Sequence, residues 1–282
     1  MTDLTLVIVN YKNPSDLYDC LATLTAYAKH DYHIIVADNN TDRAEQDNVD
    51  GVVSRIAYRP ITVKHYWENL FPGGAWNRSM EFVDTEYVCM MQEDLVFVPA
   101  QHRFWERLIG VAKDPRVGMV GPSSNGADDY QYFLRTEAPE RVKVHYIHGM
   151  MHLLRSDTLR EIGPYATDIT QACIDMCVRM AKAGLDLVID RGAFVFHSGR
   201  GAFNRALGHD GAVRWLIDLI EDEPTIFMKR FGVETFYDYM NKSPNLGLKT
   251  MLYGDMGYAA LLRELARQPE EWKPTGGTDG TV

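Results

Sequence analysis

The sequence predicts an α/β fold with a mostly parallel central sheet flanked by helices. Residues 4–9 and 34–37 are apolar and rich in β-branched side chains, which is typical of buried strands. An amphipathic helical pattern lies between them, and a strand, a helix and a second strand within about forty residues indicate a right-handed parallel unit. Residues 87–91 form a further uninterrupted apolar run, so we expect a central strand buried on both faces.

The first helix is expected to begin after Asn13, because asparagine is a favoured N-cap and Pro14 then takes the first helical position. Its apolar side chains fall on one face at helical spacing. These side chains are Leu17, Cys20, Leu21, Leu24, Tyr27 and Ala28.

The rest of the chain continues with both kinds of element. The patterns predict strands at 61–66, 117–120, 185–189 and 193–196, and one at 142–154 that is interrupted at Gly149. One helix is expected to begin near Gly73 and Gly74 and to end at about residue 83. Further helices are expected at 102–112, 172–184, 213–220 and 225–231, with a short helix capped by Ser156 and closed by Gly163. We expect one domain over 1–234, a helical appendage over 235–274 and a disordered tail over 275–282.

Composition narrows the function. The formal net charge of the 282 residues is -10 and no long basic run occurs, which argues against tight sequence-independent binding to nucleic acid. An acidic protein that handles a polyanionic ligand usually needs a bridging cation. The four cysteines form no C-x-x-C pair, and no secretory signal or membrane-spanning run is evident. We therefore expect free thiols, a cytoplasmic location and no transmembrane segment.

Carboxylates follow two of the predicted strands directly. Asp38 follows the second strand, and Glu93 and Asp94 follow the central one. Ligands of open α/β sheets bind beyond the carboxyl ends of the strands, where such side chains meet a ribose, a phosphate or a metal ion. A surface loop at Glu93 and an Asx turn at Asp38 are the structural alternatives. Gly73 and Gly74 would let backbone approach a ligand at a helix start, or simply form a turn.

An ordered set of motifs resembles the family-2 glycosyltransferases with the GT-A fold, especially their rhamnosyltransferase-like branch. The resemblance covers about residues 4–232. It rests on V-I-V-N-Y at 7–11, V-A-D-N-N-T-D at 36–42, N-L-F-P-G-G-A-W-N at 69–77 and Q-E-D at 92–94, where the D-x-D metal motif belongs. It continues with Gly149, G-P-Y at 163–165, D-M-C-V-R at 175–179, V-F-H at 195–197 and F-M-K-R-F-G at 227–232.

The resemblance implies transfer of a sugar from a nucleotide diphosphate, usually with inversion. It implies a cation held by Asp94 and His197, and carboxylate plus imidazole suits Mn²⁺ or Mg²⁺, with the imidazole favouring Mn²⁺. The donor is expected to be a UDP- or dTDP-sugar, and a glycan is the expected acceptor. The residues assigned to the donor are Val9, Tyr11, Asp38, Asn40, Gly73, Gly74, Asn77, Gln92, Glu93 and Arg200.

The chain departs from the family pattern at three places. Gln92 replaces the first carboxylate of D-x-D, and Phe71 replaces a glycine. The E-D pair that normally supplies the catalytic base is here Ala172-Cys173. Asp175 is the preferred substitute base and Asp168 the second candidate, although Asp175 could instead form an i,i+4 pair with Arg179.

Other functions stay open. A nucleotidyltransferase would need a glycine-rich, lysine-containing loop after the first strand, and residues 10–13 do not supply one. A degenerate member could bind a nucleotide sugar or a partner without catalysis, and the acceptor could be a protein or a modified nucleic-acid base. The appendage could mediate a homodimer or cap the acceptor groove.

Overall fold

The structure is a computed structural model that describes residues 3–56, 60–99, 103–127, 129–134, 138–168, 172–199, 226, 229–232 and 270–273. Its first half alternates strands and helices, and the four strands pair in parallel in the order β4-β1-β2-β3. These elements are β1 (Leu4–Asn10), α1 (Pro14–Tyr27), β2 (Tyr32–Asp38), α2 (Arg43–Arg55), β3 (Ile61–His65), α3 (Phe71–Ser79) and β4 (Tyr87–Gln92), with a 3-10 turn at Met80–Phe82.

The second half extends the same sheet with strands of both directions. β8 is antiparallel to β4 and β6, and β9 is parallel to β6. β5 and β7 each pair antiparallel with β9, and β10 pairs antiparallel with β7, so the ten-stranded sheet is mixed. The elements are β5 (Leu95–Phe97), α4 (Phe104–Ala112), β6 (Val117–Ser124), a 3-10 turn at Asp129–Gln131, β7 (Arg141–Val144), β8 (Met151–Arg155), α5 (Ser156–Ile162), α6 (Ala172–Lys182), β9 (Asp186–His197) and β10 (Glu270–Glu271).

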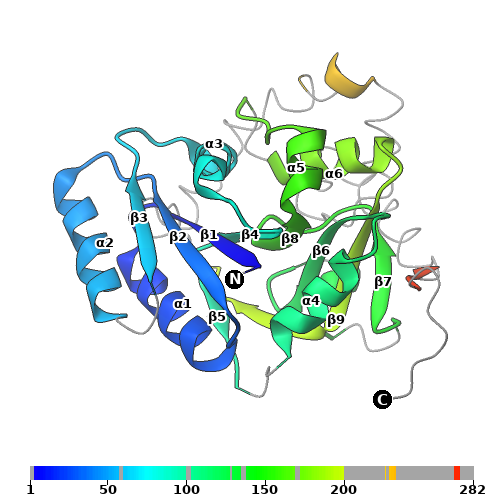
Figure 1. The fold of residues 1–282 in the computed structure, drawn as a ribbon, viewed down its shortest axis with the longest axis horizontal. Coiled ribbons are helices and arrows are strands. Elements are labelled where there is room, and N and C mark those ends of the chain that lie inside the picture. The colour runs from blue at the N-terminus through cyan, green and yellow to red at the C-terminus, as the bar shows by residue number, and fades with distance from the viewer. Residues whose placement is uncertain are drawn as a thin grey trace, which may run out of the picture.

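Each face of the sheet is covered by its own layer of helices (Figure 1). Alternate residues of β1 go to opposite faces: Leu6 and Ile8 join the cluster that contains α1 and α4, and Val7 and Val9 join the cluster that contains α3, α5 and α6. All seven residues of β1 are buried, as an apolar run in a two-sided sheet requires. The predicted α/β architecture is therefore confirmed, but the expectation of a mostly parallel sheet is wrong, because the second half adds antiparallel pairs.

Several predicted elements differ in detail. The expected strand at 142–154 is two strands, β7 and β8, which are not neighbours in the sheet. The expected strands at 185–189 and 193–196 are one continuous strand, β9, and the pairing register of β6 with β9 shifts between Pro122 and Ser123. α2 and β5 were not predicted, because α2 is mostly polar and β5 has three residues.

The predicted helix caps are only partly right. Asn13 occupies the N-cap position of α1, but its side chain makes no capping hydrogen bond. Ser156 is the first residue of α5 and follows the N-cap position at Arg155, so it was wrongly assigned as the cap. Gly163 does close α5, with a φ of 93° that glycine adopts without strain.

The C-terminal predictions fall mostly outside the described residues. The helix 213–220, the tail 275–282 and most of the appendage lie there, while residues 229–231 are helical. The described end of the appendage is extended rather than helical: β10 pairs with β7, and Trp272 is buried in the core beside α4. All four cysteines are buried and free, as predicted. Within the described part of the chain, no helix combines the length and apolar character needed to cross a bilayer.

Candidate active site

The candidate site forms where β4 ends and β9 returns beside it. Asp94 lies in the turn between β4 and β5, and β5 pairs with β9 so that Leu95 faces His197. This pairing places Asp94 Oδ2 3.1 Å from His197 Nε2. The carbonyl of Asp94 also accepts a hydrogen bond of 2.9 Å from the N–H of Ser198. Two residues that are about a hundred positions apart in the sequence are thus brought together by strand register.

One oxygen of the Asp94 carboxylate has no hydrogen-bond partner. This oxygen, Oδ1, is buried, and the residue as a whole is 4% exposed. An orphaned buried carboxylate oxygen is costly unless a cation or a donor reaches it. Carboxylate and imidazole are both ligands of Mn²⁺, so the pair fits a divalent cation. The described part of the chain holds no cluster of three or more His, Cys, Asp or Glu ligands, so water and ligand oxygens would complete the shell.

The charge state of His197 follows from the same contact. Burial alone would lower the pKa of His197, but the hydrogen bond and the negative charge of Asp94 outweigh it and raise the pKa above its ordinary value. The contact with Asp94 therefore favours the protonated form of the imidazole. A cation would replace that proton at the same position.

Asn125 fixes the backbone of His197. Its Oδ1 accepts from the His197 N–H at 2.7 Å, and its Nδ2 donates to the His197 carbonyl at 3.0 Å. Gly126 leaves room for the ring, because a Cβ at that position would stand 2.6 Å from His197 Nδ1. Neither residue was predicted from the sequence, because both lie in a stretch without a periodic pattern.

The two residues before Asp94 have different surroundings. Gln92 is half-buried, and its N–H donates to the Met150 carbonyl at 2.9 Å. Glu93 turns into the protein, where its Oε1 accepts from Asn13 Nδ2 at 3.2 Å. Burial, followed by the charge of Asp94, raises the pKa of Glu93 to about 8. Glu93 is thus buried against Asn13, and its contact with the donor stays a prediction.

Asp38 closes the turn after β2. Its Oδ1 accepts from Asn10 Nδ2 at 3.2 Å and from Asn40 Nδ2 at 2.8 Å, and its Oδ2 lies 2.7 Å from His65 Nδ1. Burial raises the pKa of Asp38, and the bonds from His65 and Asn10 offset part of that shift. The backbone N–H of Asn40 also donates to Asp38 Oδ1 at 3.3 Å, which is the Asx turn of the structural alternative. Asn40 Oδ1 also accepts from the N–H of Lys12 at 2.8 Å. This bond joins the turn to the segment that follows β1. Val9 and the half-buried Tyr11 lie just before Lys12 in that segment.

Gly73, Gly74 and Asn77 organise the protein itself. A Cβ on Gly73 would stand 2.6 Å from the Ala166 carbonyl, and one on Gly74 would stand 3.1 Å from Leu70 Cβ. Asn77 pairs with the backbone of Tyr165. Gly73 thus lets α3 approach the segment that precedes α6, and Gly74 makes room for Leu70 just before α3. Their sequence context did not reveal these packing roles.

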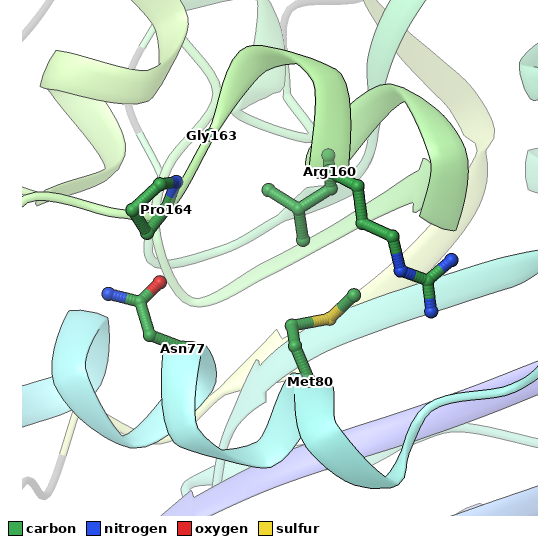
Figure 2. A pocket seen from close by; sticks show the side chains of 6 residues that line it. Asn77, Met80, Arg160, Gly163 and Pro164 are labelled. Atoms are coloured by element: carbon green, nitrogen blue, oxygen red, sulfur yellow. The ribbon is translucent and has the colours of Figure 1, made fainter.

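Asn77 also borders the cavity between α3 and α5 (Figure 2). This cavity has a volume of about 200 Å³. It contains no carboxylate or histidine, and it is lined by Asn77, Met80, Leu159, Arg160, Gly163 and Pro164.

The two candidate bases share one arginine. Asp175 is 2% exposed; its Oδ2 accepts from Arg179 Nε at 2.7 Å, and its Oδ1 bonds to Arg230. Asp168 is 55% exposed in its side chain and accepts from Arg230 Nη2 at 2.8 and 2.7 Å. Those hydrogen bonds from Arg230 lower the pKa of Asp168. The expected i,i+4 pair of Asp175 with Arg179 is present, and both Asp175 oxygens are occupied.

His148 is a residue of this site that sequence reasoning missed. It precedes β8, whose first residue, Met151, pairs with Met91 at the end of β4. Its ring centroid lies 5.7 Å from that of His197. Burial, followed by the nearby His197, lowers the pKa of His148 to about 4. Arg200, in contrast, lies outside the described residues.

Comparison with known proteins identifies the family and the fold. Residues 5–171 match the family described as glycosyl transferase family 2. The fold is similar to that of the mannosyltransferase PcManGT from Pyrobaculum calidifontis in complex with GDP-Man and Mn²⁺, with a TM-score of 0.60 and 15% identity over 94% of this chain and 79% of that one. It is also similar to GalNAc-T7 with UDP, GalNAc and Mn²⁺, with a TM-score of 0.59 and 11% identity over 77% and 50% of the chains.

At such identities the structural likeness establishes the fold, which is GT-A. No curated protein matches the chain in sequence. The family match covers more than half of the 282 residues. The chain belongs to glycosyl transferase family 2.

Proposed function

We propose that the chain is an inverting, cation-dependent glycosyltransferase that moves a sugar from a nucleotide-diphosphate donor to an acceptor hydroxyl. The observation that carries the proposal is the Asp94–His197 pair, with one carboxylate oxygen buried and unpartnered. The rhamnosyltransferase-like motifs make a hexosyl or deoxyhexosyl group the expected cargo.

The reaction balances as a single displacement. The bond from the sugar anomeric carbon to the diphosphate oxygen breaks, and its electron pair stays on the diphosphate. The acceptor oxygen forms the new bond at the opposite face, and its proton passes to a carboxylate. Mn²⁺ or Mg²⁺ at Asp94 and His197 supplies Lewis-acid neutralisation of the charge that develops on the diphosphate.

The donor nucleotide belongs beside the ends of β1 and β2. The Asp38 turn and Tyr11 border this region, and Arg200 follows His197 closely in the sequence. The family motifs favour a UDP- or dTDP-sugar. The two similar structures contain GDP-Man and UDP, so guanosine donors belong in the same comparison.

Asp168 is the better candidate base. A substrate can reach its half-exposed carboxylate, whereas Asp175 is buried between two arginines. The ion pair between Arg230 and Asp168 must break before the Asp168 carboxylate can accept a proton. Binding of the acceptor would break it by replacing Arg230 with the acceptor hydroxyl.

The alternative is a protein that binds a nucleotide sugar without transferring it. The observation in its favour is that Ala172 and Cys173 stand where the family has its acidic pair and are both buried. The acceptor class also stays a proposal, with a glycan preferred over a protein or a nucleic-acid base. The free cysteines agree with a reducing compartment, which supports the cytoplasm.

Calorimetric titration tests the donor site. We expect one of UDP, dTDP and GDP to bind in the presence of Mn²⁺ and to bind much less in its absence. Asp94→Asn should abolish the effect of Mn²⁺, and Asp47→Asn, an exposed carboxylate on α2, serves as the matched control. Slow hydrolysis of the bound donor sugar without acceptor would separate the transferase from the binding protein. Failure to bind any of these nucleotides would contradict the proposed donor site.

A further inference from the structure

His148 has one ring nitrogen committed and one available. Its Nδ1 accepts a hydrogen bond of 3.1 Å from the N–H of Met150, only two residues along the chain. A nitrogen that accepts carries no proton, so in the neutral ring the proton is on Nε2. Among the described residues, none accepts a hydrogen bond from Nε2, and the side chain is half-buried rather than enclosed.

The position of the ring is fixed from both sides. The N–H of His148 itself donates to Gln131 Oε1 at 2.9 Å, and Gln131 Nε2 donates to the Pro122 carbonyl at 2.9 Å. The Met150 carbonyl receives the N–H of Gln92, which locks the loop onto the end of β4. The ring is therefore held at the edge of the site by the backbone of the sheet.

This geometry excludes one role and favours another. A metal-bound histidine uses a lone pair on one nitrogen and normally donates through the other. In His148 the Nδ1 lone pair already accepts the Met150 N–H, and Nε2 carries the proton. Neither nitrogen has a free lone pair for a metal, so His148 is poorly suited to be a third metal ligand. An Nε2–H next to the Asp94–His197 pair is suited to an anionic oxygen instead.

We propose that His148 donates a hydrogen bond from Nε2 to the departing β-phosphate of the donor. The inference rests on the proposed function, because it takes the diphosphate to lie at Asp94 and His197. The ring centroids of His148 and His197 are 5.7 Å apart, which is close enough for both side chains to serve one phosphate group. The bond shortens and strengthens as the sugar leaves, since negative charge then collects on the β-phosphate oxygens.

Two near-isosteric variants test the role. His148→Gln keeps an amide N–H close to the position of Nε2, and His148→Met has similar length and no donor. The readouts are calorimetric affinities of the full chain for UDP and UMP with Mn²⁺, or for GDP and GMP if the guanine nucleotide binds, and for Mn²⁺ alone. Thermal unfolding confirms that both variants are folded.

We expect His148→Met to weaken diphosphate binding about 10-fold or more, because a hydrogen bond to a charged group is lost. His148→Gln should lose clearly less. Monophosphate affinity should change by less than about 2-fold, since no β-phosphate is present, and the affinity for Mn²⁺ alone should be unchanged.

Three results would overturn the inference. Diphosphate affinity could be the same in both variants, monophosphate affinity could fall as far as diphosphate affinity, or Mn²⁺ affinity could fall without nucleotide, which would make His148 a metal ligand. In each case nucleotide binding to the unsubstituted chain leaves the proposed function intact. If the unsubstituted chain binds no nucleotide, the proposed function fails, and the role of His148 fails with it.

Discussion

Asn77 and Tyr165 are joined by both ends of one amide group. Asn77 Nδ2 donates to the Tyr165 carbonyl at 2.8 Å, and the Tyr165 N–H donates to Asn77 Oδ1 at 2.7 Å. Because α3 carries Asn77 and the loop before α6 carries Tyr165, this amide ties the two halves of the domain together. The loop continues to Asp168, the proposed base.

Asn77→Ala should therefore loosen that loop. Losing two partly buried hydrogen bonds should lower the free energy of unfolding by about 1–3 kcal/mol and reduce kcat more than donor affinity. Urea unfolding and steady-state kinetics measure both effects. Asn48→Ala, on the exposed face of α2, is the matched control. Equal unfolding free energies for the Asn77 variant and the unsubstituted chain would contradict a structural clamp.

The second prediction concerns the space beside His197. Gly126→Ala should weaken Mn²⁺ binding about 10-fold or more, because the added methyl would stand 2.6 Å from His197 Nδ1 and displace the ring. The control is Gly51→Ala in α2, where nothing lies within 4 Å of the added atom. Titration with Mn²⁺ measures the change. If Gly126→Ala and Gly51→Ala bind the ion equally well, His197 is not a ligand.

The third prediction separates the two carboxylates on Arg230. Asp168→Asn should lower kcat by about 10²–10⁴-fold if Asp168 is the base, with little change in stability, because its ion pair is exposed. Asp175→Asn should instead destabilise the fold by about 3 kcal/mol, since it leaves Arg179 and Arg230 with a neutral partner at a buried position. Single-turnover kinetics and urea unfolding give the two readouts. A fully active Asp168→Asn enzyme would show that Asp168 is not the catalytic base.

The fourth prediction is a pH dependence of stability. Burial, followed by the charge of His148, lowers the pKa of His152 from 6.5 to about 3. Between about pH 6.5 and 3, His152 therefore binds a proton in the unfolded chain but not in the folded chain. The unfolding free energy should fall as pH drops from 6.5 towards 3, with a slope of up to about 1.4 kcal/mol per pH unit from this group. His152→Phe should reduce the slope in urea titrations, and an unchanged slope would contradict this assignment.

The sequence predicts the first half of the fold well for a physical reason. Strands such as β1 are buried on both faces and α1 has one apolar face, so the local pattern and the tertiary environment agree. Between β7 and β8 they do not agree. The chain leaves the sheet after Val144 and re-enters at Met151, and apolar residues of the connection such as Ile147 are still buried.

The candidate site was predictable only where local motifs mark it. Asp94 and His197 each follow an apolar strand, and that local pattern is visible in sequence. Asn125 pairs with a backbone 72 residues away, and Arg230 reaches Asp175 from 55 residues away. Contacts at such separations are set by the assembled fold, so the pairing of Asp175 with Arg179 could be expected and its second arginine could not.

The last prediction concerns a strained residue at the start of α3. Phe71 has a φ of 54°, in the left-handed region that costs an L-residue about 1–2 kcal/mol, at a position where the family motif has glycine. Its backbone is held by Asn69 Oδ1, which accepts from the Phe71 N–H at 3.0 Å, and by Asn39 Nδ2, which donates to the Phe71 carbonyl at 3.3 Å.

Phe71→Gly should therefore be more stable than Phe71→Ala by about 1 kcal/mol, because both lose the ring and only glycine adopts this φ without strain. At Ser54, an exposed helical position in α2, the same two substitutions should rank in the opposite order, with alanine more stable by about 1 kcal/mol. Urea unfolding of the four variants measures both differences. If alanine is also the more stable at position 71, Phe71 is not strained, and the departure from the family glycine has no energetic consequence at this position.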